Sequence, residues 1–203
     1  PILFYMSGII AWEYFSNCLI MTSNTFLSNA NLFGKVYFPR FIVPLSIVIS
    51  NLARFFIQLI MFFVIFLYVS TIGEISYSIN IYSLIGIPLL ILQMAIFSIG
   101  IGMIISSLTI KYRDLKFLIN FGTQLLMYGS AIVYPLSIVP DKYKIYILIN
   151  PMTGIIACFR QFTIGGDFIG FEMIIQSIVI TIITFALGLF IFSIVEQNFI
   201  DSI

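Results

Sequence analysis

Residues 81–110 read IYSLIGIPLLILQMAIFSIGIGMIISSLTI, a stretch without a single Asp, Glu, Lys or Arg. A bilayer core about 30 Å thick needs about 20 apolar residues of α-helix, so this stretch is long enough to cross one. Further long charge-free intervals occur at residues 14–34, 55–73, 117–140 and 173–195. The pattern therefore predicts a polytopic membrane protein.

The composition supports this prediction. Of the 203 residues, 61% are hydrophobic and 8% are charged, whereas soluble domains have roughly 25% charged residues. Such a chain has too little polar surface for a soluble enzyme, a disordered tail or a nucleic-acid binder. It also lacks His, the commonest general base and metal ligand. Its two Cys, Cys18 and Cys158, cannot form a four-ligand zinc site. We therefore expect no catalytic residue, metal site or cofactor site on this chain.

The spans are expected to be helices, because lipid offers no partner for free backbone groups and the alternation typical of barrel strands is absent. We predict an all-α bundle, with residues 1–203 forming one transmembrane domain. Its five spans are predicted at residues 3–28, 42–69, 81–109, 117–136 and 172–195. Because the chain starts at Pro1 in apolar sequence without a signal peptide, we also expect an N-terminal helix and a first span to be missing.

Residues 137–171 do not have the pattern of a span, because charged residues open and close the segment. Its two apolar runs, 145–149 and 155–159, are each too short to cross a bilayer. We predict a re-entrant helical hairpin with its turn at Asn150 and Pro151. An amphipathic segment that lies on the membrane surface is the alternative.

The basic residues indicate the orientation. Lys35 and Arg40 lie in the first connection, and Lys111, Arg113 and Lys116 lie two spans later, so all five are on one side. The positive-inside rule makes that side cytoplasmic, and it places the C-terminus there too.

Two charged residues fall inside predicted spans. Counted from the cytoplasmic ends at 1.5 Å per residue, Glu13 and Arg54 both lie about 21 to 24 Å deep. Since intramembrane charges usually pair with one another or face a wet cavity, we predict an ion pair between them. In the alternative, Arg54 extends to the membrane surface.

A stripe of small side chains marks one face of the third predicted span. Ser98, Gly102 and Ser106 are spaced by four residues, so they lie along one side of a helix. Small residues let a second helix approach closely in a membrane. We predict a helix-packing face here.

The connection of residues 29–40 is short, amphipathic and aromatic. It is suited to a helix at the membrane surface that a soluble partner could move. An aromatic anchor at the interface is the alternative, because Tyr37 and Phe38 beside Lys35 and Arg40 fit that role equally well.

Several short motifs, taken in order along the chain, resemble one family. They are Lys35-Val-Tyr-Phe-Pro-Arg40 with Pro44-Leu-Ser46, Tyr112-Arg-Asp114, Val133-Tyr-Pro135, Asn150-Pro-Met152 with Gly154 and Phe159-Arg160, and the ending Glu196-xx-Phe199-x-Asp201-x-Ile203. Over essentially its whole length the chain resembles the permease subunits of type 2 ABC transporters that export polysaccharides, namely the O-antigen and teichoic-acid exporters. One departure is Ala131, where the family usually has Pro after Ser.

The resemblance implies a permease of six spans that forms a homodimer in the cytoplasmic membrane and binds two copies of an ABC ATPase. ATP and Mg²⁺ would bind that partner, which would dock on a coupling helix in the first cytoplasmic loop. The coupling residues would be Asn29, Asn31, Leu32, Lys35, Tyr37, Phe38, Pro39 and Arg40. Paired re-entrant helices would occupy residues 137–171, and the cargo would be a lipid-linked glycan.

We therefore expect a non-enzymatic exporter subunit embedded in membrane lipid. One alternative is a type 2 permease for drugs or lipids. The other is a membrane-embedded enzyme that acts on lipid-linked sugars, which would require positioned acids or bases in a cavity. Copurification of an ATPase would favour the exporter.

Overall fold

The computed structural model describes residues 2–29, 39–72, 82–165 and 170–200. All regular secondary structure in these ranges is helical. The α-helices are α1 (Ile2–Ser23), α2 (Thr25–Ser28), α4 (Ile42–Ile72), α5 (Tyr82–Lys111), α6 (Leu115–Tyr128), α7 (Asp141–Leu148), α8 (Pro151–Ile164) and α9 (Phe171–Ile200), and a 3₁₀ turn covers Leu136–Ile138.

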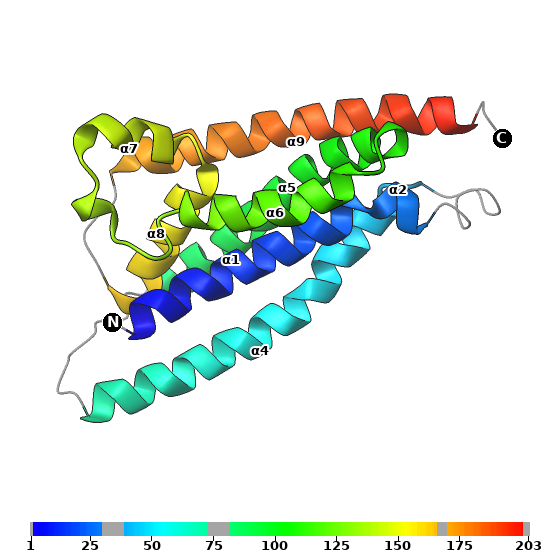
Figure 1. Ribbon diagram of the computed structural model, residues 1–203. Helices are drawn as coiled ribbons and strands as arrows, with labels where there is room; N and C mark the ends of the chain where they lie inside the picture. Colours follow the sequence, from blue (N-terminus) through cyan, green and yellow to red (C-terminus); the bar gives the residue numbers. More distant parts are fainter. Residues whose placement is uncertain (1, 30–38, 73–81, 166–169, 201–203) are drawn as a thin grey trace.

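The long helices run side by side, and they place the connections at two opposite ends of the molecule (Figure 1). One end holds α2, the start of α4, the junction of α5 with α6, and the last turns of α9; we call it the α2 end. The start of α1, with α7 and α8, lies at the other end, which we call the α8 end. Arg40, the 111–116 connection and the end of α9 therefore share one end of the bundle.

Helix α5 is the central helix of the bundle. It packs against α1, α8 and α9, whereas α4 packs mainly on α1 and diverges from the other helices along its length (Figure 1). In the most apolar part of each helix, 44% of the α5 residues are buried, against 17% in α4 and 17% in α9. The outward faces of α4 and α9 are therefore apolar and unburied, as expected for surfaces that contact lipid.

Two glycines bring α5 and α9 into backbone contact. A Cβ atom added to Gly188 would lie 3.0 Å from the Cα of Gly100. A Cβ added to Gly100 would in turn lie 2.8 Å from the Cα of Phe185. Since neither position has room for a side chain, the absence of one allows this close approach.

In the described part of the chain, three helices are long and apolar enough to cross a bilayer. They are Ile42–Ile72, Ser83–Lys111 and Phe171–Glu196. These helices coincide with the predicted spans at 42–69, 81–109 and 172–195. Helix α1, which carries Glu13 in its middle, is not one of the three.

The predicted span at 117–136 requires correction. Helix α6 ends at Tyr128 after 14 residues, a length of about 21 Å at 1.5 Å per residue. That is shorter than the bilayer core of about 30 Å. The helix stops because Gly129 caps it and Ala131 has a φ of 52°, which leaves the α-helical region. The charge-free interval is long, but its second half is irregular chain.

Helices α7 and α8 form the hairpin expected within residues 137–171, and the turn between them is at Asn150 and Pro151. The Asn150 side chain accepts a hydrogen bond from the Met152 amide at 3.1 Å, and Pro151 occupies the first helical position; both features favour the start of a helix. Helix α8 is buried against α1, α5 and α9. A surface-lying segment does not fit that burial, whereas re-entry into a membrane stays a prediction.

Candidate functional site

At the α2 end, the start of α4 is bound to the end of α9. The Arg40 amide donates to Oε1 of Glu196 at 3.3 Å, and Nη1 of Arg40 donates to the Glu196 carbonyl at 3.0 Å. Arg40 is 5% exposed. Two residues 156 positions apart in the sequence are thereby joined by two hydrogen bonds, both donated by Arg40.

The same end of α9 also contacts α2. The rings of Phe26 and Phe192 stack with their centroids 4.7 Å apart, within the range of favourable aromatic pairs. The Phe26 amide donates to Oγ of Ser106 at 3.2 Å, so α2 is fixed to α5 as well. Both ends of the 29–40 connection are thus attached to the bundle.

Of the expected coupling residues, only three belong to the described chain. Asn29 follows α2, and its Nδ2 donates to the Thr25 carbonyl at 3.0 Å. Pro39 and Arg40 lead into α4. Asn31, Leu32, Lys35, Tyr37 and Phe38 lie outside the described residues, so the coupling role of this connection stays a prediction.

At the α8 end, Arg160 joins three segments through main-chain carbonyls. Its Nη1 donates to Ala131 at 2.8 Å, its Nη2 to Ile132 at 2.6 Å, and its Nε to Phe4 at 3.3 Å. The guanidinium also lies 3.6 Å from the centre of the Phe4 ring, a cation–π geometry. Arg160 therefore holds the irregular chain after α6 against α1 and α8.

The α7–α8 turn binds this irregular chain too. Nδ2 of Asn150 donates to Oγ of Ser130 at 2.8 Å, and Ser130 donates to the Leu126 carbonyl at 2.6 Å. Asn150 therefore caps α8 through its oxygen and fixes the end of α6 through its nitrogen. The turn residues named from the sequence lie at a junction of three segments.

Glu13 pairs with Gln58 rather than with Arg54. Nε2 of Gln58 donates to the Glu13 carboxylate, whereas Arg54 and Glu13 form no ion pair in the described part of the chain. Gln58 lies four residues beyond Arg54, about one helical turn or about 6 Å further along α4. The estimate from the sequence, which placed Glu13 and Arg54 at the same depth, was therefore wrong by about one turn. Arg54 is exposed on the outside of α4.

The small residues of α5 lie where α1 and α2 approach it. Ser98 and Ser106 are fully buried, and a Cβ added to Gly102 would lie 2.6 Å from the Cβ of Thr22. Sequence reasoning named this face of α5 but missed the opposite one, where Gly100 meets Gly188. Gly100 and Gly188, which have no side chain, were the available signal in the sequence.

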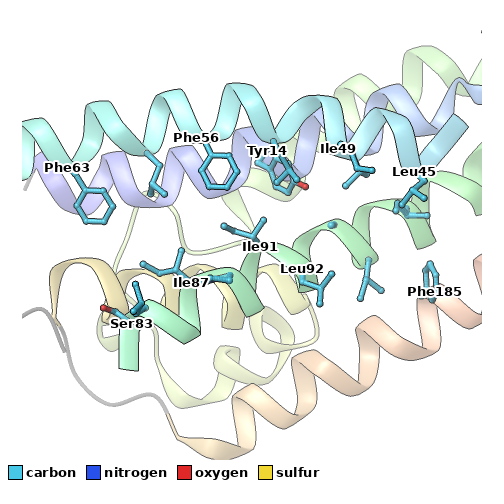
Figure 2. A pocket seen from close by; sticks show the side chains of 18 of the residues that line it. Tyr14, Leu45, Ile49, Phe56, Phe63, Ser83, Ile87, Ile91, Leu92 and Phe185 are labelled. Carbon is cyan, nitrogen blue, oxygen red and sulfur yellow. The ribbon is translucent and has the colours of Figure 1, made fainter. Parts of the chain in front are cut away.

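An apolar cleft of about 690 Å³ separates α4 from α5. Figure 2 shows Leu45, Ile49, Phe56 and Phe63 of α4 facing Ile87, Ile91 and Leu92 of α5. Among all the lining side chains, those of Tyr14 and Ser83 alone carry a polar atom. A cleft of this volume accommodates a small ligand, and its walls favour hydrocarbon over water.

Helix α6 presents an exposed stripe of aromatic and amide side chains. Its positions recur at intervals of three or four residues and so share one helix face. The stripe consists of Phe117, Asn120, Phe121, Gln124 and Tyr128. Phe117 is 73% exposed and Tyr128 is 61% exposed, although both are aromatic. We call this surface the α6 stripe.

The family model for ABC-2 type transporters matches residues 2–164. The chain belongs to the ABC-2 type transporter family. A helical bundle with three apolar helices of membrane-spanning length agrees with this assignment. The ABC-2 chain is accordingly a membrane protein, and the resemblance to type 2 ABC permeases is confirmed.

Three relatives of this ABC-2 chain are O-antigen export system permease proteins named RfbA. It is 28% identical to one RfbA of Klebsiella pneumoniae over 198 residues, which cover 98% of this chain and 74% of the relative. A second RfbA of that organism matches equally well over 199 residues. The RfbA of Myxococcus xanthus is 22% identical over 159 residues, covering 77% of this chain and 58% of that protein.

Proposed function

We propose that this ABC-2 chain is the membrane subunit of an ATP-driven exporter that moves a lipid-linked polysaccharide across the cytoplasmic membrane. The observation that carries the proposal is its similarity, over 98% of its length, to permeases of O-antigen export. Lipid-linked glycans of the O-antigen, capsule or teichoic-acid type are the proposed cargo.

The energy for export would come from a separate subunit. We propose two copies of an ABC ATPase, which bind ATP and Mg²⁺, beneath a homodimer of the permease. The ATPases would dock at the α2 end, which then faces the cytoplasm together with the C-terminus. The 29–40 connection would receive their movement, since α2 and α4 at its two ends are both attached to the bundle.

The α6 stripe is the proposed contact surface for the glycan. Aromatic faces stack on the apolar faces of sugar rings, and amide side chains exchange hydrogen bonds with hydroxyl groups. An exposed helix face that combines Phe117, Phe121 and Tyr128 with two amides supplies both kinds of contact. Such a surface tolerates many sugars, which suits a polymer that must keep moving.

The test uses the protein expressed in its own host together with the proposed ABC ATPase. Affinity purification of the permease should bring down the ATPase, and deletion of the permease should abolish the surface polysaccharide. Phe121→Ala should lower export at normal membrane abundance, and Leu118→Ala, on the same helix beside the stripe, should not. A permease that purifies without an ATPase and itself modifies a glycolipid would instead be an enzyme.

The apolar cleft favours a second candidate function, a type 2 permease for drugs or lipids. Its lining is almost entirely hydrocarbon, which suits an apolar cargo and not a sugar polymer. In that case, deletion would change drug susceptibility or lipid distribution and leave the surface polysaccharide unchanged.

A further inference from the structure

The last turns of α9 contact both ends of the 29–40 connection. On the α2 side, the Phe192 ring stacks on Phe26 with a centroid distance of 4.7 Å. On the α4 side, Glu196 accepts hydrogen bonds from the Arg40 amide at 3.3 Å and from Nη1 of Arg40 at 3.0 Å. The two points of attachment lie before and after the connection in the sequence.

Phe192 and Glu196 are four residues apart, so they project from the same face of α9. Both contacts are protected from solvent: Phe192 is 3% exposed, Phe26 is 2% exposed and Arg40 is 5% exposed. Buried hydrogen bonds to a charged group are stronger than those at a surface, and breaking them leaves an unpaired polar atom. The attachment is therefore firm on both sides.

Helix α9 can carry a displacement from this end to the opposite end of the bundle. Its 30 residues are one uninterrupted helix of about 45 Å. It contacts α5 at backbone distance through Gly188, and near its start it contacts α8, where a Cβ added to Gly154 would lie 3.2 Å from the Cβ of Ser177. Contacts along α9 therefore connect Glu196 to α8, the helix that carries Arg160.

We propose that Phe192 and Glu196 hold the two ends of the 29–40 connection, and we call this pair of contacts the clasp. Because of the clasp, α9 moves with the connection and transmits the movement of the ATPases through the bundle. This inference rests on the proposed function, and it makes the two side chains positioning residues for transport. Neither residue belongs to the connection itself, so their removal should leave ATPase docking intact.

The first experiment removes the side-chain contacts of the clasp, namely the ring stack and the acceptor for the Arg40 amide. The hydrogen bond from Nη1 of Arg40 to the main-chain oxygen of residue 196 remains. A double variant, Phe192→Leu with Glu196→Ala, is expected to reach the membrane and to copurify the ATPase at the normal level. ATP hydrolysis should continue, while the amount of polysaccharide exported per ATP should fall severalfold. The matched control is Ser193→Ala with Ile194→Ala, two exposed positions on the same turn of α9, and it should retain normal export.

A conservative variant separates the clasp from a need for negative charge. Glu196→Gln keeps an oxygen that can accept from the Arg40 amide. As a single variant, with Phe192 unchanged, it should therefore support normal export. Loss of ATPase copurification in the double variant would assign these residues to docking, and unchanged export per ATP would mean that the two side chains do not couple α9 to the connection. Either result would overturn the proposal.

The second experiment replaces the clasp with a covalent bond. Phe26→Cys with Phe192→Cys removes the ring stack, so export per ATP should fall; a short thiol-specific cross-linker should then raise it again. If α2 and α9 had to separate during transport, cross-linking would instead abolish the remaining export. The native Cys18 and Cys158 are buried and should react slowly.

The cross-linking yield needs no ATPase, which keeps the two proposals separable. Phe26→Cys with Phe192→Cys should cross-link more completely than Phe26→Cys with Ser193→Cys. A lower yield would refute the contact itself. If the yield is as expected but the native permease brings down no ATPase and supports no polysaccharide export, the proposed function fails while the clasp remains as a contact.

Discussion

Arg160 of α8 and Ile132 of the chain after α6 are joined by a hydrogen bond of 2.6 Å from Nη2 to the main-chain oxygen. The same guanidinium donates to the carbonyls of Ala131 and Phe4, so one side chain binds three main-chain carbonyls. Lys has a single donor group and cannot reach all three. Arg160→Lys should destabilise the protein by about 2 kcal/mol, and Arg160→Met by more.

Thermal unfolding in detergent would measure the effect of Arg160. Lys142→Met is the matched control, because Lys142 is a cation exposed on α7, and its replacement should leave the unfolding temperature nearly unchanged. An Arg160→Met protein as stable as the control would show that the three hydrogen bonds contribute nothing net.

Ala131 should be more stable as Gly. Its φ of 52° lies in the left-handed region, where a Cβ costs about 1 to 2 kcal/mol. Ala131→Gly should therefore raise the free energy of unfolding by up to about 1 kcal/mol, since the entropy of the freer unfolded chain offsets part of the gain. Ala131→Pro should destabilise strongly because the proline ring fixes φ near −65°.

The pair of Ala131 variants is informative because the two changes act in opposite directions at one site. Unfolding of both proteins in the same detergent would check the expectation. Equal stability of the Gly and Pro proteins would mean that the turn does not hold a left-handed residue.

The contact between α5 and α9 should not tolerate a methyl group. Gly188→Ala places a Cβ 3.0 Å from the Cα of Gly100, and helix backbones cannot move aside as a flexible side chain can. We expect a loss of about 1 to 3 kcal/mol, typical of overpacking. Unfolding by a denaturing detergent would measure it.

Gly122→Ala is the control for the change at Gly188. A Cβ at Gly122, in the middle of α6, would meet nothing within 4 Å, so the change should be neutral or stabilise the helix by up to about 1 kcal/mol. If Gly188→Ala behaved in the same way, the backbone contact would be refuted.

A double-mutant cycle should detect an interaction of Glu13 with Gln58 and none with Arg54. Hydrogen bonds between helices in membranes contribute about 0.6 kcal/mol on average, so Glu13→Leu with Gln58→Leu should show a coupling energy of that order. Glu13→Leu with Arg54→Leu should be additive. The reverse pattern would restore the ion pair that the sequence predicted.

The sequence predicted most of the helices because charge-free length is a direct consequence of bilayer thickness. Helices α4, α5 and α9 begin and end within three residues of the predicted spans, apart from five extra residues at the end of α9. It failed for α6, because hydropathy does not distinguish a helix from apolar irregular chain. Only the left-handed conformation of Ala131 and the carbonyls bound by Arg160 reveal that difference.

Contacts between distant segments were harder to predict. The stripe of Ser98, Gly102 and Ser106 could be found because it follows from spacing within one helix. The pairing of Glu13 with Gln58 depends on how far α1 and α4 are offset along their axes. Because the true offset differs by one turn from the estimate, the partner of Glu13 is Gln58 and not Arg54. The bond between Arg40 and Glu196 joins positions 156 residues apart, and no local pattern in the sequence reports such a contact.

The meeting of Gly100 with Gly188 limits how this protein can change shape. Two helices in backbone contact have no layer of side chains between them that could rearrange, so α5 and α9 tilt or translate as one rigid unit. By contrast, α4 meets α5 mainly across the apolar cleft and packs instead on α1. A change in the distance between α4 and α5 therefore breaks fewer close contacts than a separation of α5 from α9.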